Sequence, residues 1–212
     1  DASRVYGLEL EYILSPNRIN FYIDGQTLIE EHIPGIPGDK FMETYTKTPS
    51  FNKVRIAKEF VKFNERCFAR LLGDMRSYNY VIDITPDFED EQYRVRAIDF
   101  DQQCYEGRKN MYLPQFFKEN SMVVEFCSDV MTPETVEQYR KEERVLIRRR
   151  YETAQHRFKK LINCLCNDKL SSKIKIEQLK EELEKYHKSS FNSCKNMGDI
   201  LVLHLKLMLS IT

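Results

Sequence analysis

One stretch near the middle of the chain constrains its fold most strongly, because a short polar loop runs directly into an apolar strand. Residues 72–83 read Leu-Gly-Asp-Met-Arg-Ser-Tyr-Asn-Tyr-Val-Ile-Asp. Asp74 and Asn79 are thus separated by four residues, and the β-branched run 80–84 follows at once. Such a run predicts a strand, so both polar side chains are expected at its entrance.

The segments on either side of this loop predict a helix before it and a second strand after it. Apolar side chains recur at steps of three and four through residues 54–72, which is typical of a helix with a buried face. Gly73 suits the chain reversal that ends such a helix. Downstream, an acidic, proline-containing loop over residues 85–91 is expected to join the strand 80–84 to a strand over 93–98.

The loop and the end of the second strand carry the residue types that phosphoryl transfer requires. One carboxylate accepts the proton of the acceptor hydroxyl, while an amide and a second carboxylate hold magnesium against the nucleotide phosphates. Asp74 and Asn79 lie in the loop, and Asp99 and Asp101 follow the second strand. A plain helix and hairpin, whose polar loop residues form caps and turns, would give the same local pattern.

These segments resemble the catalytic loop and the metal-binding segment of the protein-kinase-like superfamily, and of its aminoglycoside and choline kinase branch in particular. The resemblance implies that Asp74 is the catalytic base and that Asn79 and Asp99 bind metal. Asp101 is a reserve metal ligand, because either acid of the Ile-Asp-Phe-Asp segment fits the motif. The implied cofactors are ATP and Mg²⁺.

An earlier segment, residues 18–35, fits the same order. It reads as two strands joined by Asp24-Gly25, a strong hairpin signal, followed by Glu-Glu-His-Ile-Pro-Gly. In the small-molecule kinases an equivalent hairpin leads into the hinge that binds adenine. By that resemblance Glu31, His32 and Ile33 would bind the nucleotide. Taken alone, the segment is simply a stable hairpin with a Pro-Gly turn.

The chain also departs from the family pattern. Leu72 stands where the family loop carries a histidine, no glycine-rich loop occurs, and no lysine precedes Lys40. A helix over residues 5–14, with Glu9 and Glu11, is the expected counterpart of the helix whose carboxylate pairs with the kinase lysine. We expect the lysine and glycine-rich strands to lie upstream of this sequence, which would then be part of a longer chain. The alternative is a degenerate pseudokinase.

Composition gives no support for a nucleic-acid-binding, membrane-spanning or disulfide-rich secreted protein. Among the 212 residues, Lys plus Arg equals Asp plus Glu at 33 each, so net charge gives no reason to expect nucleic acid or a membrane surface as partner. The longest apolar stretch, residues 200–209, is too short for a membrane span. The six cysteines lack the spacing of a disulfide framework, so we expect reduced thiols and a cytoplasmic protein.

The last third of the chain has a helical pattern. Thr132-Pro133-Glu134 is a typical helix start, and Ser171 or Ser172 can begin a later helix. Leucines alternate strictly through 201–209, yet leucine favours a helix and helices precede this segment, so a helix is expected. The arginine run 148–150 is either a solvated face balanced by nearby glutamates or a phosphate or nucleic-acid contact.

The sequence therefore predicts an α+β, protein-kinase-like fold with a partial N-lobe. Residues 1–38 would be the N-lobe remnant, 39–131 the core of the C-lobe with the catalytic loop, and 132–212 its helical C-terminal part. The expected function is ATP- and Mg²⁺-dependent phosphoryl transfer to a hydroxyl-bearing acceptor, with a small molecule favoured. The alternatives are a pseudokinase-like binding scaffold without catalysis and an unrelated helical interaction protein.

Overall fold

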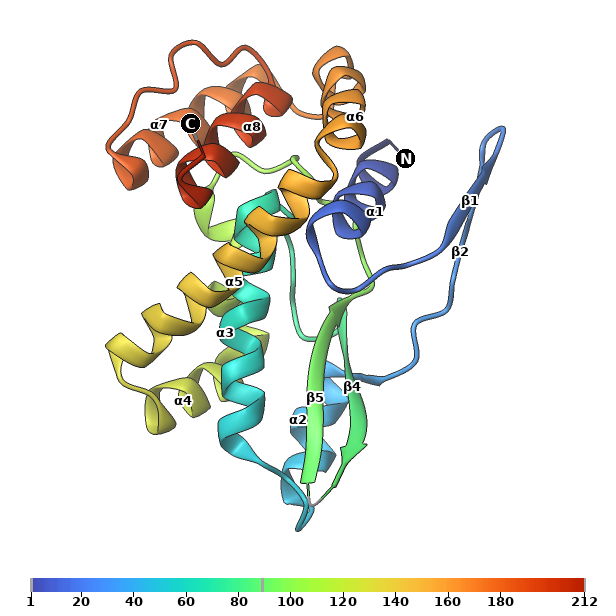
Figure 1. The fold of residues 1–212 in the computed structure, drawn as a ribbon, viewed down its shortest axis with the longest axis vertical. Coiled ribbons are helices and arrows are strands. Elements are labelled where there is room, and N and C mark those ends of the chain that lie inside the picture. Colours follow the sequence, from blue (N-terminus) through green and yellow to red (C-terminus); the bar gives the residue numbers. More distant parts are fainter. Residues whose placement is uncertain (1, 89, 212) are drawn as a thin grey trace.

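The computed structural model describes residues 2–88 and 90–211, and they form an α+β fold with two antiparallel sheets (Figure 1). The first sheet pairs β1 (Phe21–Asp24) with β2 (Thr27–Glu30), and the second has the order β3 (Ile36–Pro37), β4 (Tyr80–Asp87), β5 (Asp90–Ala97). The helices are α1 (Ala2–Leu14), α2 (Gly38–Thr44), α3 (Lys53–Arg70), α4 (Ser121–Val130), α5 (Pro133–Thr153), α6 (Gln155–Asn167), α7 (Lys173–His187) and α8 (Met197–Leu209). The α+β class predicted from the sequence is confirmed.

Helix α3 runs through the middle of the molecule and belongs to two hydrophobic cores (Figure 1). Phe60 and Phe63 pack with α2, β4 and β5 in one core, whereas Phe68 packs with α1 and with α5 to α8 in the other. Its charged side chains in this region are buried as well, so each needs a partner. Arg66 pairs with Glu59 and Glu143, and Arg70 with Glu11.

The predicted helix before the loop is confirmed, but its ending differs from the expectation. Asn52 caps the start by accepting a hydrogen bond from the amide of Arg55 (3.1 Å). At the other end Leu71, not Gly73, adopts the left-handed conformation, with φ 55°. Gly73 instead lies where space is tight, because a Cβ there would lie 3.2 Å from the carbonyl oxygen of Gln102.

Strands β4 and β5 are longer than the sequence predicted. Residues 85–91 were expected to be a loop, yet Thr85 pairs with Gln92, and Pro86 with Glu91. Proline is tolerated because this end of the ladder is exposed and lies at the edge of the sheet. The hairpin of β1 and β2 is confirmed, with Gly25 at φ +57° in its turn, and it projects from the body of the molecule (Figure 1).

The C-terminal third is helical as predicted. The side chain of Thr132 accepts a hydrogen bond from the amide of Thr135 (3.3 Å) at the start of α5, and Ser172 caps α7. The segment with alternating leucines is α8, which packs against α3, α5, α6 and α7. Because α8 is surrounded on several sides, apolar residues at both odd-numbered and even-numbered positions are buried. The strict alternation of leucines therefore does not indicate a strand here.

Candidate functional site

The polar loop between α3 and β4 is held at both of its ends by backbone hydrogen bonds. The amide of Gly73 donates to the carbonyl of Gln102 (3.2 Å), and that of Asp74 donates to Met111 (3.1 Å). Asp74 has φ 58°, a conformation that costs free energy in a residue with a Cβ. Non-glycine residues in this conformation cluster at functional sites, where the surrounding contacts maintain them.

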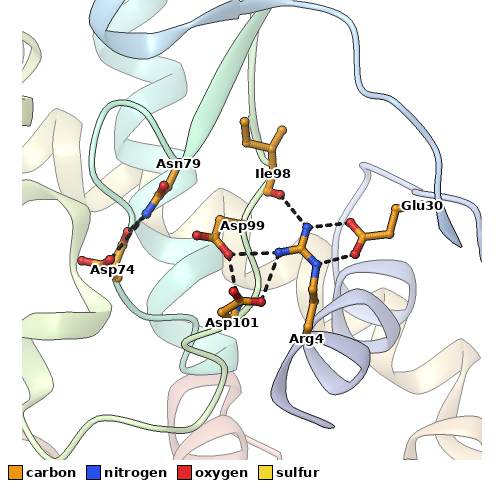
Figure 2. A network of polar contacts seen from close by, with 7 residues as sticks. All are labelled: Arg4, Glu30, Asp74, Asn79, Ile98, Asp99 and Asp101. Carbon is orange, nitrogen blue, oxygen red and sulfur yellow. Dashed lines mark hydrogen bonds and ion pairs between the residues drawn. The ribbon is translucent and has the colours of Figure 1, made fainter. Parts of the chain in front are cut away.

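Asn79 connects the loop to the segment after β5. Its Nδ2 donates to the carbonyl oxygen of Asp74 (2.7 Å) and, more weakly, to Oδ2 of Asp74 (3.5 Å). Its own carbonyl accepts from the amide of Ile98 (3.0 Å), directly before Asp99. Figure 2 shows Asp99 between the Asp74–Asn79 contact on one side and Arg4 on the other. The structure therefore brings Asp74, Asn79 and Asp99 into one neighbourhood.

Arg76 is a cation next to Asp74 within the same loop. Its Nε donates to Oδ1 of Asp74 (2.8 Å), and its Nη1 donates to Glu119 (2.8 Å). The guanidinium also lies over the ring of Phe117, 5.3 Å from the centroid. The hydrogen bonds to Asp74 and Glu119 raise the pKa of Arg76 above its ordinary value. The expected catalytic carboxylate thus has a permanent positive charge beside it.

Arg4 is a second cation and contacts the acidic pair, Asp99 and Asp101. From helix α1, its Nη1 donates to Asp99 (3.2 Å) and to Asp101 (3.1 Å), while Nε and Nη2 bind the two oxygens of Glu30 on β2 (Figure 2). The hydrogen bond to Glu30 is the main cause that raises the pKa of Arg4. One guanidinium therefore links α1, the hairpin and the acidic pair.

The expected nucleotide-binding residues follow the hairpin directly. Glu31 accepts hydrogen bonds from the backbone and side chain of Asn20 (3.0 and 2.7 Å), which extends the pairing of the hairpin. His32 is exposed and Ile33 is buried. The polar contact from this region to the acidic pair is made by Glu30, through Arg4, and not by these three residues.

The carboxylates expected to pair with a kinase lysine have other partners. Glu9 binds Arg157 (2.9 Å) at the surface, and Glu11 is buried against Arg70. Lys40 pairs with Glu43 (3.0 Å) on the exposed face of α2. The cations near the acidic residues are instead Arg4 and Arg76.

Sequence reasoning did not assign a site role to Arg4 or Glu30. They lie 95 and 69 positions before Asp99 in the chain, and no local pattern connects residues that far apart. Arg76 was visible in the loop, where its position two residues after Asp74 was the available signal.

Oxygen donors are the chemistry that this region offers to a cofactor. No cluster of three or more Asp, Glu, His or Cys side chains suited to a metal ion occurs in residues 2–88 and 90–211. Asn79 and Asp99 would contribute one amide and one carboxylate oxygen. Mg²⁺ commonly takes only one or two protein carboxylates and fills its other positions with water and phosphate oxygens. The donor set fits a Mg²⁺ ion that arrives with a nucleotide.

Comparisons with known proteins give no independent identification. No family model matches the chain, and no significant match was found among curated proteins or solved structures. Over the part of the chain that the structure describes, none of the helices combines the length and apolar character needed to cross a membrane.

Proposed function

We propose that the chain carries the metal and acceptor side of a kinase-like phosphotransferase site. The observation that supports this most strongly is the arrangement of Asn79. Its amide nitrogen is used to hold the carbonyl of Asp74, and its backbone carbonyl holds the strand that leads to Asp99. The side-chain oxygen of Asn79 is left as a ligand for Mg²⁺. Its position beside Asp74 and Asp99 suits an ion that bridges nucleotide phosphates.

Each polar group then has a role in the reaction. Asp74 accepts the proton of the attacking hydroxyl and orients that hydroxyl, while Asn79 and Asp99 hold Mg²⁺. Asp101 is the reserve ligand. Arg76, beside Asp74, is placed to neutralise charge on the phosphoryl oxygens as it develops in the transition state. Adenine would bind along residues 31–33, and the acceptor is a hydroxyl-bearing small molecule.

The hairpin of β1 and β2 is consistent with a larger nucleotide-binding lobe. A two-stranded sheet is marginal in isolation. Tyr22 and Ile29, which pair across it, are 65% and 58% exposed. Further strands packed on these side chains would supply the lysine and the glycine-rich turn that this sequence lacks.

A second candidate is a binding scaffold without catalysis, and the contacts of Arg4 favour it. Its guanidinium bridges Asp99 and Asp101, so an internal cation already neutralises the carboxylates that a metal would need. The positive charge of Arg4 at Oδ1 of Asp99 opposes a metal ion there, so Mg²⁺ binding favours a state in which Arg4 leaves Asp99. If the protein is a binding scaffold, Arg4 is expected to stay bound to Asp99 and Mg²⁺ is not expected to bind.

Two substitutions distinguish these functions in the full-length protein. Asp74→Asn keeps the shape of the loop but removes the proton acceptor, whereas Asp99→Asn weakens the metal site. A phosphotransferase should lose turnover of ATP by orders of magnitude in both variants. Only Asp99→Asn should also weaken Mg²⁺-dependent nucleotide binding. Melting temperatures control for folding.

The scaffold candidate gives a different result. If the wild type shows no turnover with any acceptor tested and no Mg²⁺-dependent nucleotide binding, the phosphotransferase proposal is wrong. If both folded variants keep wild-type turnover, the motif is not catalytic.

A further inference from the structure

A concave pocket lies where the end of α1 meets α5. Tyr12 and Ser15 line it from the end of α1 and the following turn, Arg18 lies just beyond them, and Arg149 and Arg150 come from α5. Its volume is about 530 Å³. Small-molecule sites range from roughly 300 to 1,000 Å³, so this pocket can enclose a compact ligand.

The three arginines of this pocket have no acidic partner. No Asp or Glu lines the pocket, and among the described residues no carboxylate forms an ion pair with Arg18, Arg149 or Arg150. Burial lowers the pKa of Arg150; Glu143 opposes this effect, and the positive charges of Arg66 and Arg18 add to it. The pocket thus gathers positive charge that no ion pair with a described residue neutralises.

Arginines elsewhere on the same helix behave differently. Arg144 binds Glu65 (2.5 Å), and Arg148 binds Glu152 one turn along the helix (2.9 Å). Of the two interpretations of the arginine run, a solvated face balanced by glutamates therefore holds for Arg148 but not for Arg149 and Arg150. On α5, the two arginines that line the pocket, Arg149 and Arg150, form no ion pair with a described residue.

We propose that this pocket is an anion site for a small molecule with clustered phosphate groups. Guanidinium groups offer planar forks of donors that match phosphate oxygens. Ser15 is buried, and its Oγ accepts from the amide of Asn17 (3.3 Å), so its hydroxyl proton can be donated to the ligand. Three guanidinium groups and a hydroxyl around one cavity suit a ligand with more than one negative charge.

The pocket is poorly suited to nucleic acid. Binding of single strands depends on bases that stack on open aromatic faces. Tyr12 is the aromatic residue of the pocket, and its ring is covered by Arg18 at 5.1 Å and by Arg157 at 4.1 Å from the centroid. A phosphorylated small molecule needs no such face.

This site is separate from the proposed phosphotransferase site. Arg4 lies near the start of α1, and Tyr12 lies eight residues later. At 1.5 Å per residue, this separation is roughly 12 Å along the helix axis. Binding here needs no Mg²⁺ and none of the carboxylates around Arg4.

Titration calorimetry with tripolyphosphate, in EDTA and at low salt, tests the proposal. The wild type should bind, and the Arg149→Gln/Arg150→Gln double variant should bind at least about tenfold more weakly, since charge-assisted hydrogen bonds are lost. Arg148→Gln is the matched control on the same helix and should bind as the wild type does. Asp99→Asn should also bind normally, which separates this site from the phosphotransferase site.

A second variant guards against a folding defect in the double variant. Arg18 is exposed and lies outside the helices, so Arg18→Gln should leave the fold intact and weaken tripolyphosphate binding in the same direction. Absence of binding by the wild type, or equal binding by the wild type and a folded double variant, overturns the proposal. Tighter binding of a short single-stranded RNA at this site than of tripolyphosphate overturns it in favour of a nucleic-acid surface.

Discussion

A pair of hydrogen-bonded histidines, His204 fully buried and His187 partly buried, predicts that the fold loses stability in mild acid. The Nε2 of His204 on α8 donates to the carbonyl of Phe68 (2.9 Å), so its Nδ1 accepts from Nε2 of His187 (2.8 Å) and both rings are neutral. Burial is the main cause that lowers the pKa of His204 to about 3, and the neighbouring His187 and Arg144 add to it. Burial and Arg144 lower the pKa of His187 to about 4.

The direction of these pKa shifts determines how folding stability changes with pH. Below the unfolded-state pKa of about 6.5, the unfolded chain binds protons that the folded chain excludes, so folding stability is lost as the pH falls. For the fully buried His204, the free energy of unfolding should decrease by about 2 kcal/mol between pH 7 and pH 5. His187 is only partly buried, so it adds a smaller loss in the same direction.

His204→Gln isolates this contribution. A glutamine can donate to Phe68 and accept from His187 but does not titrate in this range. Urea unfolding at pH 7, 6 and 5, followed by circular dichroism, should show a shallower loss of stability in this variant than in the wild type. His156→Gln, at an exposed position on α6, is the control and should keep the wild-type slope. Equal losses in the wild type and in His204→Gln would refute the reasoning.

Two further substitutions test local packing and the contacts of Arg4. In Gly38→Ala the new Cβ would lie 2.3 Å from Cε2 of the fully buried Tyr80, so chemical denaturation should show a loss of about 2 kcal/mol. Gly25→Ala, with nothing within 4 Å but φ +57°, should cost only about 1 kcal/mol; equal losses would contradict the packing argument. Arg4→Gln should strengthen Mg²⁺ binding severalfold by calorimetry, because it frees the acidic pair, whereas Arg157→Gln should not. Unchanged or weaker Mg²⁺ binding in Arg4→Gln would show that Arg4 does not compete with the metal.

Local patterns predicted much of the fold because the deciding interactions are local. Asp24-Gly25 determines a tight turn, and Thr132 with Pro133 determines the start of α5, whatever surrounds them. The end of α3 was harder to predict, because the left-handed residue is Leu71, whereas the glycine two positions later lies in a tight space next to Gln102. Gln102, which limits the space at Gly73, comes from a segment far along the chain, so a local pattern does not reveal this contact.

The contacts of the candidate site also include local ones, which the sequence could predict, and long-range ones, which it could not. The contact between Asp74 and Asn79 was predictable because both residues lie in one loop, which leads directly into β4. The partners of the acidic pair were not predictable, because Arg4 reaches Asp99 from α1, which lies 95 positions earlier in the chain. Long-range ion pairs depend on how α1 packs, and this packing is determined by hydrophobic residues that carry no information about the site.

The most direct test of the central claim is whether a divalent metal binds between the loop and the acidic pair in the presence of nucleotide. Mn²⁺ can replace Mg²⁺, and its paramagnetism broadens the NMR signals of amides close to the metal. With ATP and traces of Mn²⁺, we expect the amide signals of residues 74–79 and 98–101 to disappear first, and Asp99→Asn to prevent this. If these signals persist while others broaden, or if Asp99→Asn has no effect, Asn79 and Asp99 do not form a metal site and the phosphotransferase account is contradicted.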